Sequence, residues 1–301
     1  MQTKQAIQTE ISLPVKEIEV NGMNLNYVEK GSGETIVFIH GAVSDLRTWM
    51  EQIEAFSQNY RVISYSRRYH QPQGKAGKNP EYSPALHTSD LIEFLRRLDS
   101  GKAHLVGHSY GASIALTAAL RNPELVASLT LGEPSPFPSL LSGEGASLLA
   151  GQKRAFDEAI RIAESGDEET AVREFLHTVV GVDVLGLLPE ARRAVVLENQ
   201  DTLLPMLKTY FDSPPISRRQ LKSLNVPTLL ITGELSPKLA RVTNESINGG
   251  LRNSKIAVLK CASHGLQIEN PAGFNKMVSD FISENKISSR SNIKQHLYEL
   301  I

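Results

Sequence analysis

The sequence predicts an α/β fold in which a mostly parallel sheet of eight strands is flanked by helices. Short continuous apolar runs, typical of strands buried on both faces, recur along the chain. Stretches with helical spacing of apolar residues alternate with these runs, and the alternation is typical of a parallel sheet covered by helices. A length of 301 residues allows one large domain of this class or two small ones.

The first two strands are expected to be antiparallel. Residues 18–20 and 25–28 flank Asn21-Gly22, a dipeptide that favours a tight hairpin turn. Buried strands are then expected at residues 35–39, 60–65, 103–106, 127–131, 228–231 and 256–259. The helical pattern predicts helices at residues 47–57, 84–98, 111–121 and 271–284.

One region breaks the alternation of strands and helices. From Pro134 to about Leu221 the strand signal vanishes and helical periodicity takes over. We interpret this region as a helical cap inserted into the sheet domain, with an ordinary run of surface helices as the alternative. The expected organisation is a core of residues 16–133 and 222–285, a cap of residues 134–221, and terminal extensions of residues 1–15 and 286–301.

Composition argues against several classes of protein. A net charge of −1 provides no basic patch for nucleic acid. No apolar run approaches the roughly 20 residues that a membrane-spanning helix needs. The single cysteine, Cys261, excludes an intrachain disulfide and a cysteine-based zinc site. Residues 1–14 lack the apolar core of a secretory signal, so we expect a cytoplasmic protein that is a monomer or a homodimer.

The most informative motif is Gly107-His108-Ser109-Tyr110-Gly111, a G-x-S-x-G sequence. An expected strand leads into it and an alanine-rich helical run leads out. A strand that turns sharply into a helix holds the serine on a strained elbow, with its hydroxyl above the sheet. Small residues are needed two positions before and after the serine, because a side chain there would collide with the turn. Ser109 is therefore a candidate nucleophile, which requires a base within hydrogen-bond reach.

Four motifs in this order resemble the α/β-hydrolase superfamily over roughly residues 17–285. They are Phe38-Ile39-His40-Gly41, the G-x-S-x-G elbow, residues 226–233, and Ser263-His264-Gly265 with the Glu269-Asn270-Pro271 that follows. The resemblance implies the α/β-hydrolase fold with an inserted helical cap. It also implies Ser109 as nucleophile, His264 as base, and an oxyanion hole formed by the backbone N–H groups of Ala42 and Tyr110.

The acidic partner of the histidine departs from the family's commonest pattern. Many members carry an aspartate at the position of Ser236, and a serine cannot supply the negative charge that stabilises imidazolium. Glu133 follows the sixth strand, 24 residues beyond Ser109, a location similar to that in branches such as some haloalkane dehalogenases. We therefore favour Glu133 as the acid, with Glu234 as the runner-up.

A second departure lies after the fourth strand. Relatives often show Asp-Arg-x-Gly-x-Gly here, whereas this chain has Ser66, Tyr69 and Gln71 in place of the aspartate and the two glycines. Arg67 and Arg68 could bind an acidic group of a substrate. We favour the simpler interpretation, a loop held by pairing between arginine and carboxylate.

The expected function is that of a cofactor-independent serine hydrolase acting on a small, apolar ester or lactone. No metal-binding motif and no phosphate-binding loop is recognisable, so neither a metal nor a cofactor is expected. A serine at the elbow argues against haloalkane dehalogenase and epoxide hydrolase chemistry, which needs a carboxylate nucleophile. The alternatives are a lactonase or C–C bond hydrolase, a cofactor-free perhydrolase or haloperoxidase, and a ligand-sensing member with little turnover.

Overall fold

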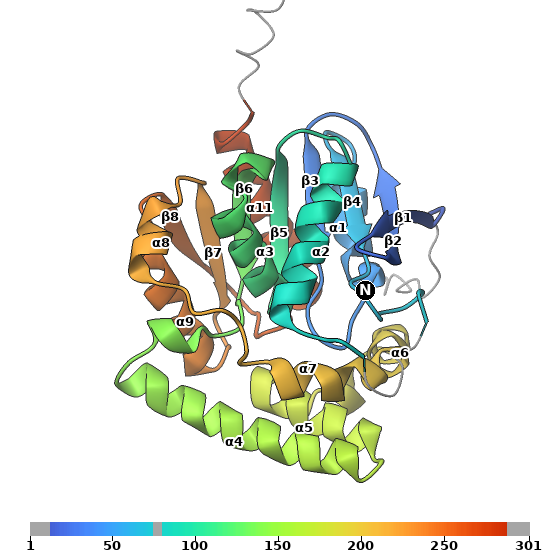
Figure 1. The fold of residues 1–301 in the computed structure, drawn as a ribbon, viewed down its shortest axis with the longest axis vertical. Helices are drawn as coiled ribbons and strands as arrows, with labels where there is room; N and C mark the ends of the chain where they lie inside the picture. Colours follow the sequence, from blue (N-terminus) through green and yellow to red (C-terminus); the bar gives the residue numbers. More distant parts are fainter. Residues whose placement is uncertain (1–12, 75–79, 288–301) are drawn as a thin grey trace, which may run out of the picture.

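The computed structural model describes residues 13–74 and 80–287, and these residues contain one eight-stranded sheet. Its strands lie in the order β1-β2-β4-β3-β5-β6-β7-β8 (Figure 1). They are β1 (Lys16–Val20), β2 (Met23–Lys30), β3 (Thr35–Ile39), β4 (Arg61–Tyr65), β5 (Ala103–His108), β6 (Val126–Gly132), β7 (Thr228–Gly233) and β8 (Ser254–Leu259). The pairs β1–β2 and β2–β4 are antiparallel and the others parallel, which confirms the predicted fold class.

The hairpin between β1 and β2 forms where the sequence predicts it. Asn21 and Gly22 both have positive φ, 48° and 75°, as a two-residue turn of the primed type requires. Val20 pairs with Met23 directly across the turn. Residues 1–12 and 288–301, which make up most of the predicted terminal extensions, lie outside the described residues.

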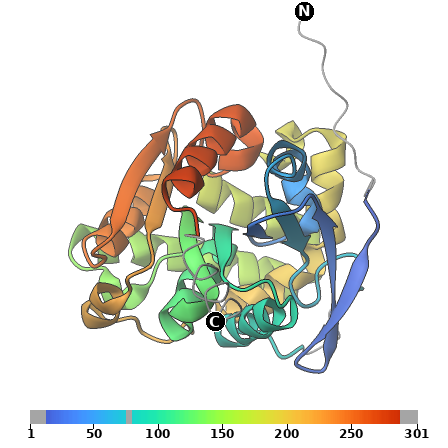
Figure 2. The ribbon, with the colours of Figure 1, turned by 90° about the horizontal axis from the view of Figure 1, so that it is seen from above.

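Helices cover both faces of the sheet (Figures 1 and 2). The helices α1 (Met50–Phe56) and α11 (Pro271–Glu284) bury aromatic and aliphatic side chains against one face. The helices α2 (Pro84–Arg97), α3 (Tyr110–Arg121) and α9 (Lys238–Asn248) pack against the other. The helix predicted over residues 47–57 is shorter, since a 3₁₀ turn at Leu46–Trp49 precedes α1.

The region between β6 and β7 is helical, as its periodicity predicts. It contains α4 (Glu144–Glu164), α5 (Glu168–Val180), α6 (Glu190–Glu198), α7 (Leu203–Thr209) and α8 (Arg218–Ser223). Figure 1 shows α4 to α7 across the carboxyl ends of the parallel strands, whereas α8 lies beside the sheet. The return to the sheet therefore begins with α8, which crosses the predicted boundary at residues 221 and 222. None of the helices over the described ranges is long and apolar enough to cross a membrane.

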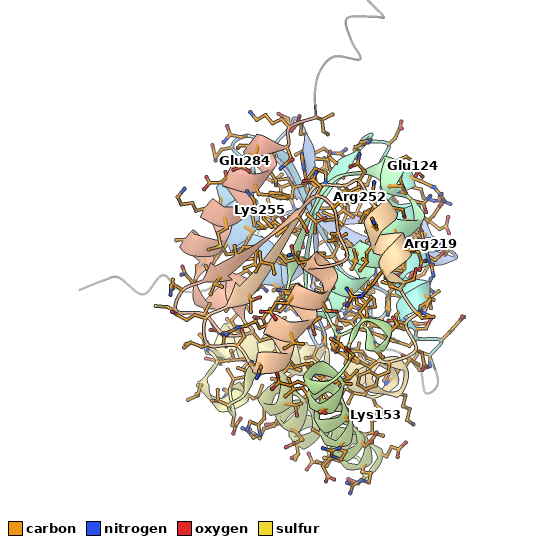
Figure 3. The ribbon with its side chains drawn as sticks, turned by 90° about the vertical axis from the view of Figure 1, so that its left-hand side faces the viewer. Glu124, Lys153, Arg219, Arg252, Lys255 and Glu284 are labelled. Atoms are coloured by element: carbon orange, nitrogen blue, oxygen red, sulfur yellow. The ribbon has the colours of Figure 1, made fainter. Side chains whose placement is uncertain are left out.

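The strand β8 corrects one expectation. Its apolar run predicts a strand buried on both faces, but Ile256 and Val258 are 39% and 46% exposed. The reason is position, because β8 forms the edge of the sheet and has a strand neighbour on one side only. Beside them, Lys255 pairs with Glu284 of α11 at 2.6 Å, on the side of the molecule that Figure 3 shows.

Candidate active site

Ser109 occupies the sharp turn between β5 and α3. Its backbone has φ 51° and ψ −122°, a strained conformation for a residue with a side chain. A Cβ on Gly107 would lie 2.6 Å from the Cα of Ala112, and one on Gly111 would collide with the backbone at Ile39. Both glycines are therefore required by the close approach of helix and strand, and Ser109 is held at the carboxyl end of β5.

His264 lies in the loop between β8 and the short helix α10 (Leu266–Glu269). Its Nε2 is 3.0 Å from the Oγ of Ser109, and its Nδ1 is 2.6 Å from Oε2 of Glu133. These contacts fit the tautomer in which Nδ1–H donates to the carboxylate and Nε2 accepts from the serine hydroxyl. The structure thus brings the three predicted side chains into one hydrogen-bonded chain.

Glu133 directly follows β6, has a positive φ of 45°, and is 1% exposed. Its second oxygen, Oε1, accepts hydrogen bonds from the backbone N–H of Gly233, at 2.7 Å, and from the hydroxyl of Ser236. Burial alone would raise the pKa of this carboxyl, but the hydrogen bond and charge of His264 together with these two donors hold the pKa below its ordinary value. The carboxylate therefore stays ionised beside the imidazole.

Ser236 is a site residue whose role sequence reasoning missed. It stands where many relatives carry the acid, and here its hydroxyl donates to the carboxylate of Glu133, which follows β6. Glu234, the runner-up for the acid, does not contact His264. Its carboxylate pairs with Lys260 at 2.6 Å and accepts from the Cys261 N–H at 3.1 Å.

His108, the residue before Ser109, supports the loop that carries His264. Its Nε2–H donates to the backbone carbonyl of His264 at 2.7 Å. Burial, and then the charge of His264, lowers the pKa of His108 to about 3. His108 is thus a neutral donor that fixes the backbone at residue 264.

The two residues predicted to form the oxyanion hole lie beside Ser109. Tyr110 begins α3 directly after the serine, and Ala42 follows β3 and lines the same cavity as Ser109. His40 shapes this loop: its Nδ1–H donates to the Gly41 carbonyl at 2.9 Å. Burial, reinforced by a neighbouring arginine, keeps the pKa of His40 far below its ordinary value, which suits a structural role.

Neither arginine that follows β4 lines a cavity beside Ser109. Arg68 pairs with the buried Asp90 at 2.8 Å, which agrees with the favoured interpretation of a loop held by a carboxylate. Arg67 differs from that interpretation, because its guanidinium donates to the carbonyls of His40 and Gly41 and to the hydroxyl of Tyr82. The ring of Tyr69 lies near Arg68 and away from these cavities.

Two cavities of different character meet at Ser109. One, of about 410 Å³, lies between the loop after β3 and the helices α5 and α6, and its walls are mostly aliphatic. The other, of about 510 Å³, lies between α4, α5 and the start of α9 and is lined by many polar side chains. Ser109, Val179 and His264 line both, so a molecule bound at the serine could extend into either cavity.

Polar contacts, some of them fully buried, tie the helical region to the sheet domain beside the aliphatic cavity. Asn199, just after α6, donates to Asp45 at 2.7 Å and accepts from the N–H of Gln71 at 2.8 Å. Arg192 of α6 donates to Glu51 of α1 at 3.0 Å. Because Asn199 and Asp45 are fully buried, these contacts fix α6 as one wall of the cavity.

Across residues 13–74 and 80–287, no group of three or more histidine, cysteine, aspartate or glutamate side chains is arranged to hold a metal ion. The hydrogen-bonded chain of Ser109, His264 and Glu133 is the arrangement expected of a nucleophile, a base and an acid. Proton transfer from the serine to the histidine is the chemistry that this arrangement supports most directly.

A family model described as the alpha/beta hydrolase fold matches residues 34–271. Among curated proteins, the chain is 23% identical to Epoxide hydrolase 3 from Xenopus tropicalis over 90% of this chain and 78% of that protein. It is 28% identical to Strigolactone esterase D14 from Arabidopsis thaliana over 82% of this chain and 92% of that one. The solved structure of the enol-lactonase from Burkholderia xenovorans LB400 superposes with a TM-score of 0.74 at 21% identity, covering 89% of this chain and 100% of that chain.

Proposed function

Since the chain belongs to the α/β-hydrolase family, we propose that it is a cofactor-independent serine hydrolase that cleaves a carboxylic ester-like bond through an acyl-enzyme on Ser109. The observation that carries the proposal is the chain of hydrogen bonds from Ser109 to His264 at 3.0 Å and on to Glu133 at 2.6 Å. A serine hydroxyl is unreactive at neutral pH, and His264 lies where it can act as its base. The Glu133 carboxylate holds His264 in the required tautomer and would stabilise the imidazolium that forms.

In the first step, Nε2 of His264 takes the proton of Ser109 while Oγ attacks the carbonyl carbon of the substrate. The imidazolium that forms is stabilised by the ionised Glu133. The negative charge on the carbonyl oxygen is accepted by the N–H groups of Tyr110 and Ala42, and each such donor contributes roughly 3 kcal/mol to transition-state stabilisation. His264 then returns its proton to the leaving alcohol, which departs.

In the second step, water hydrolyses the acyl-enzyme. His264 removes a proton from the water, whose oxygen attacks the acyl carbon, and the same imidazolium then protonates Ser109 as it leaves. The carboxylic acid is released and the free enzyme is restored. No redox change or metal ion enters either step.

The two cavities suggest the class of substrate. We propose that helices α4 to α7 act as a cap and that the aliphatic cavity holds an apolar arm of the ester or lactone. Side chains of α5 and α6 such as Phe175, Leu176 and Val195 line this cavity. Transfer of such an arm from water contributes about 0.8 kcal/mol for each methylene buried.

The residue at the elbow distinguishes this proposal from epoxide hydrolysis, the activity in the name of one relative. In epoxide opening, a carboxylate nucleophile forms an ester with the enzyme, and water can then cleave that ester. A serine would form an ether, which water does not cleave under these conditions. Ser109 therefore favours acyl transfer.

The test is a panel of p-nitrophenyl esters, from acetate to octanoate, with Ser109→Ala as the control. We expect hydrolysis by the wild type, its loss in Ser109→Ala, and covalent labelling of Ser109 by a fluorophosphonate. Absence of both hydrolysis and labelling in the wild type would overturn the proposal. Labelling without turnover would favour a ligand-sensing protein, and peroxide-dependent oxidation of halide would favour the perhydrolase or haloperoxidase alternative.

A further inference from the structure

Arg67 is a buried cation whose bonding partners are neutral. The residue is 1% exposed, and its guanidinium donates to the backbone carbonyls of Gly41, at 2.7 Å, and His40, at 3.2 Å, and to the hydroxyl of Tyr82 at 3.1 Å. None of these acceptors is a carboxylate. Burial of a charge is costly, so a guanidinium held by dipoles alone calls for an explanation.

The buried histidines around Arg67 do not neutralise its positive charge. His40, His70 and His87 are buried near it, and the pKa of each is far below its ordinary value, first because of burial and second because of the Arg67 charge. These histidines are therefore neutral at physiological pH. Among Arg67 and these three histidines, Arg67 carries the positive charge.

The carbonyl that Arg67 binds most closely belongs to the peptide group of the oxyanion hole. The Gly41 oxygen accepts from Nη2 of Arg67 at 2.7 Å and lies 2.9 Å from Nδ1 of His40. The other end of the same peptide group is the N–H of Ala42, one of the two proposed donors. Hydrogen bonds to a carbonyl oxygen polarise its peptide group and strengthen its N–H as a donor, because hydrogen bonds in a chain reinforce one another.

Arg67 also contacts the residue that supplies the other donor. The carbon of its guanidinium lies 5.0 Å from the centre of the Tyr110 ring, within the range of a cation–π contact. Tyr110 is itself 2% exposed, so this contact is buried. A single side chain thus links the loop after β3 to the start of α3, the two segments between which the oxyanion would form.

We propose that Arg67 is a positioning residue of the oxyanion hole: its guanidinium orients and polarises the Gly41–Ala42 peptide group and holds it in register with Tyr110. This role rests on the proposed serine hydrolase function. Arg67 does not touch the substrate, and it acts by making the Ala42 N–H a stronger and better placed donor to the negative charge that develops during acylation.

The test compares Arg67→Lys with Arg68→Lys. Lysine keeps the positive charge at residue 67 but cannot span both carbonyls as the planar guanidinium does. Arg68 is the matched control, since it is an adjacent, buried arginine that pairs with Asp90. We expect Arg67→Lys to lower kcat by about 10- to 100-fold with KM nearly unchanged, less than the roughly 100- to 1,000-fold cost of removing an oxyanion donor. Arg68→Lys should keep kcat near the wild-type value.

A second readout separates positioning from a merely structural role. An alkyl trifluoromethyl ketone forms an adduct with serine that carries the oxyanion, whereas the alcohol product of an alkyl ester is neutral and places no negative charge between the two N–H donors. In Arg67→Lys, the affinity for the ketone should fall by the same factor as kcat/KM, while that for the product is unchanged. Equal losses for both ligands, or an unchanged kcat, would overturn the proposal.

Folding is checked by thermal unfolding, and active sites are counted with the fluorophosphonate. If Arg67→Lys does not fold, Tyr82→Phe provides the test, because it removes one acceptor of the guanidinium and leaves the ring in place. A fall in kcat of several-fold at constant KM would support the role, and an unchanged kcat would refute it. A wild type that neither hydrolyses esters nor reacts with the phosphonate would instead remove the proposed function, and this role with it.

Discussion

Glu133→Gln is the substitution whose effect the structure specifies most fully. The wild-type carboxylate uses Oε1 to accept from the Gly233 N–H at 2.7 Å and Oε2 to accept from His264 at 2.6 Å. The Gly233 N–H can only donate, so the oxygen of the glutamine must face it. The amide nitrogen of the glutamine must then face Nδ1 of His264.

This orientation predicts the magnitude of the effect. Facing an amide N–H₂, Nδ1 must act as an acceptor, and the proton moves to Nε2, which then cannot take the proton of Ser109. The negative charge that stabilises imidazolium is lost as well. The wrong tautomer in a serine triad costs about 10⁴ in kcat, or roughly 5.5 kcal/mol. We expect a loss of this size in Glu133→Gln with little change in KM.

The assay is the initial rate of p-nitrophenyl butyrate hydrolysis at neutral pH, with folding monitored by thermal unfolding. Glu234→Gln is the matched control, since that carboxylate pairs with Lys260 at an exposed site. Its kcat should change by less than about threefold, as exposed ion pairs contribute little. A Glu133→Gln variant within tenfold of the wild type, or a larger loss in Glu234→Gln, would refute the assignment.

Three further predictions concern packing and pH. Leu188→Trp should obstruct the aliphatic cavity and lower kcat/KM for the octanoate ester by about 200-fold relative to acetate, because each of roughly four methylenes contributes about 0.8 kcal/mol. Equal effects on both esters would place the acyl chain elsewhere. Gly111→Ala should destabilise the fold by about 3 kcal/mol or more in thermal unfolding, because its Cβ would collide with backbone. By contrast, Gly151→Ala in α4 should raise the free energy of unfolding by about 0.5–1 kcal/mol. A less stable Gly151→Ala than Gly111→Ala variant would contradict this packing. In the fold, burial lowers the pKa of His40, His70, His87 and His108, so below about pH 6.5 the unfolded chain binds more protons than the folded chain. Stability should therefore fall between pH 7 and pH 5, by about 2 kcal/mol for His108, whose pKa is about 3, and in the same direction for the other three. Urea unfolding at the two pH values measures this loss, and equal stabilities would contradict it.

Much of the fold and the placement of the site could be predicted because the signals are local. The glycines around Ser109 mark a turn that the neighbouring backbone makes obligatory. Glu133 is predicted as the acid from its place after the next strand and its spacing from Ser109, which resemble those in some branches of the family. Because parallel strands end at one edge of a sheet, residues after β5, β6 and β8 converge there. The catalytic roles of the three residues remain predictions, tested by the variants above.

The remaining features depend on packing between distant segments. Nothing in the dipeptide Arg67-Arg68 indicates that Arg68 pairs with a carboxylate whereas Arg67 donates to two backbone carbonyls. The exposure of Ile256 follows from which strand ends the sheet, and an apolar run carries no information on that point. The hydrogen bond from Ser236 to Glu133 joins two loops whose approach only the folded chain reveals.

If the proposed mechanism is correct, Ser109 carries the acyl group during turnover. The most direct measurement is rapid acid quenching of the enzyme with a p-nitrophenyl ester, followed by intact mass and peptide mass analysis. We predict one acyl group per chain, located on Ser109, with none bound in Ser109→Ala. Acylation at another residue, or turnover that persists in Ser109→Ala, would refute the acyl-enzyme mechanism.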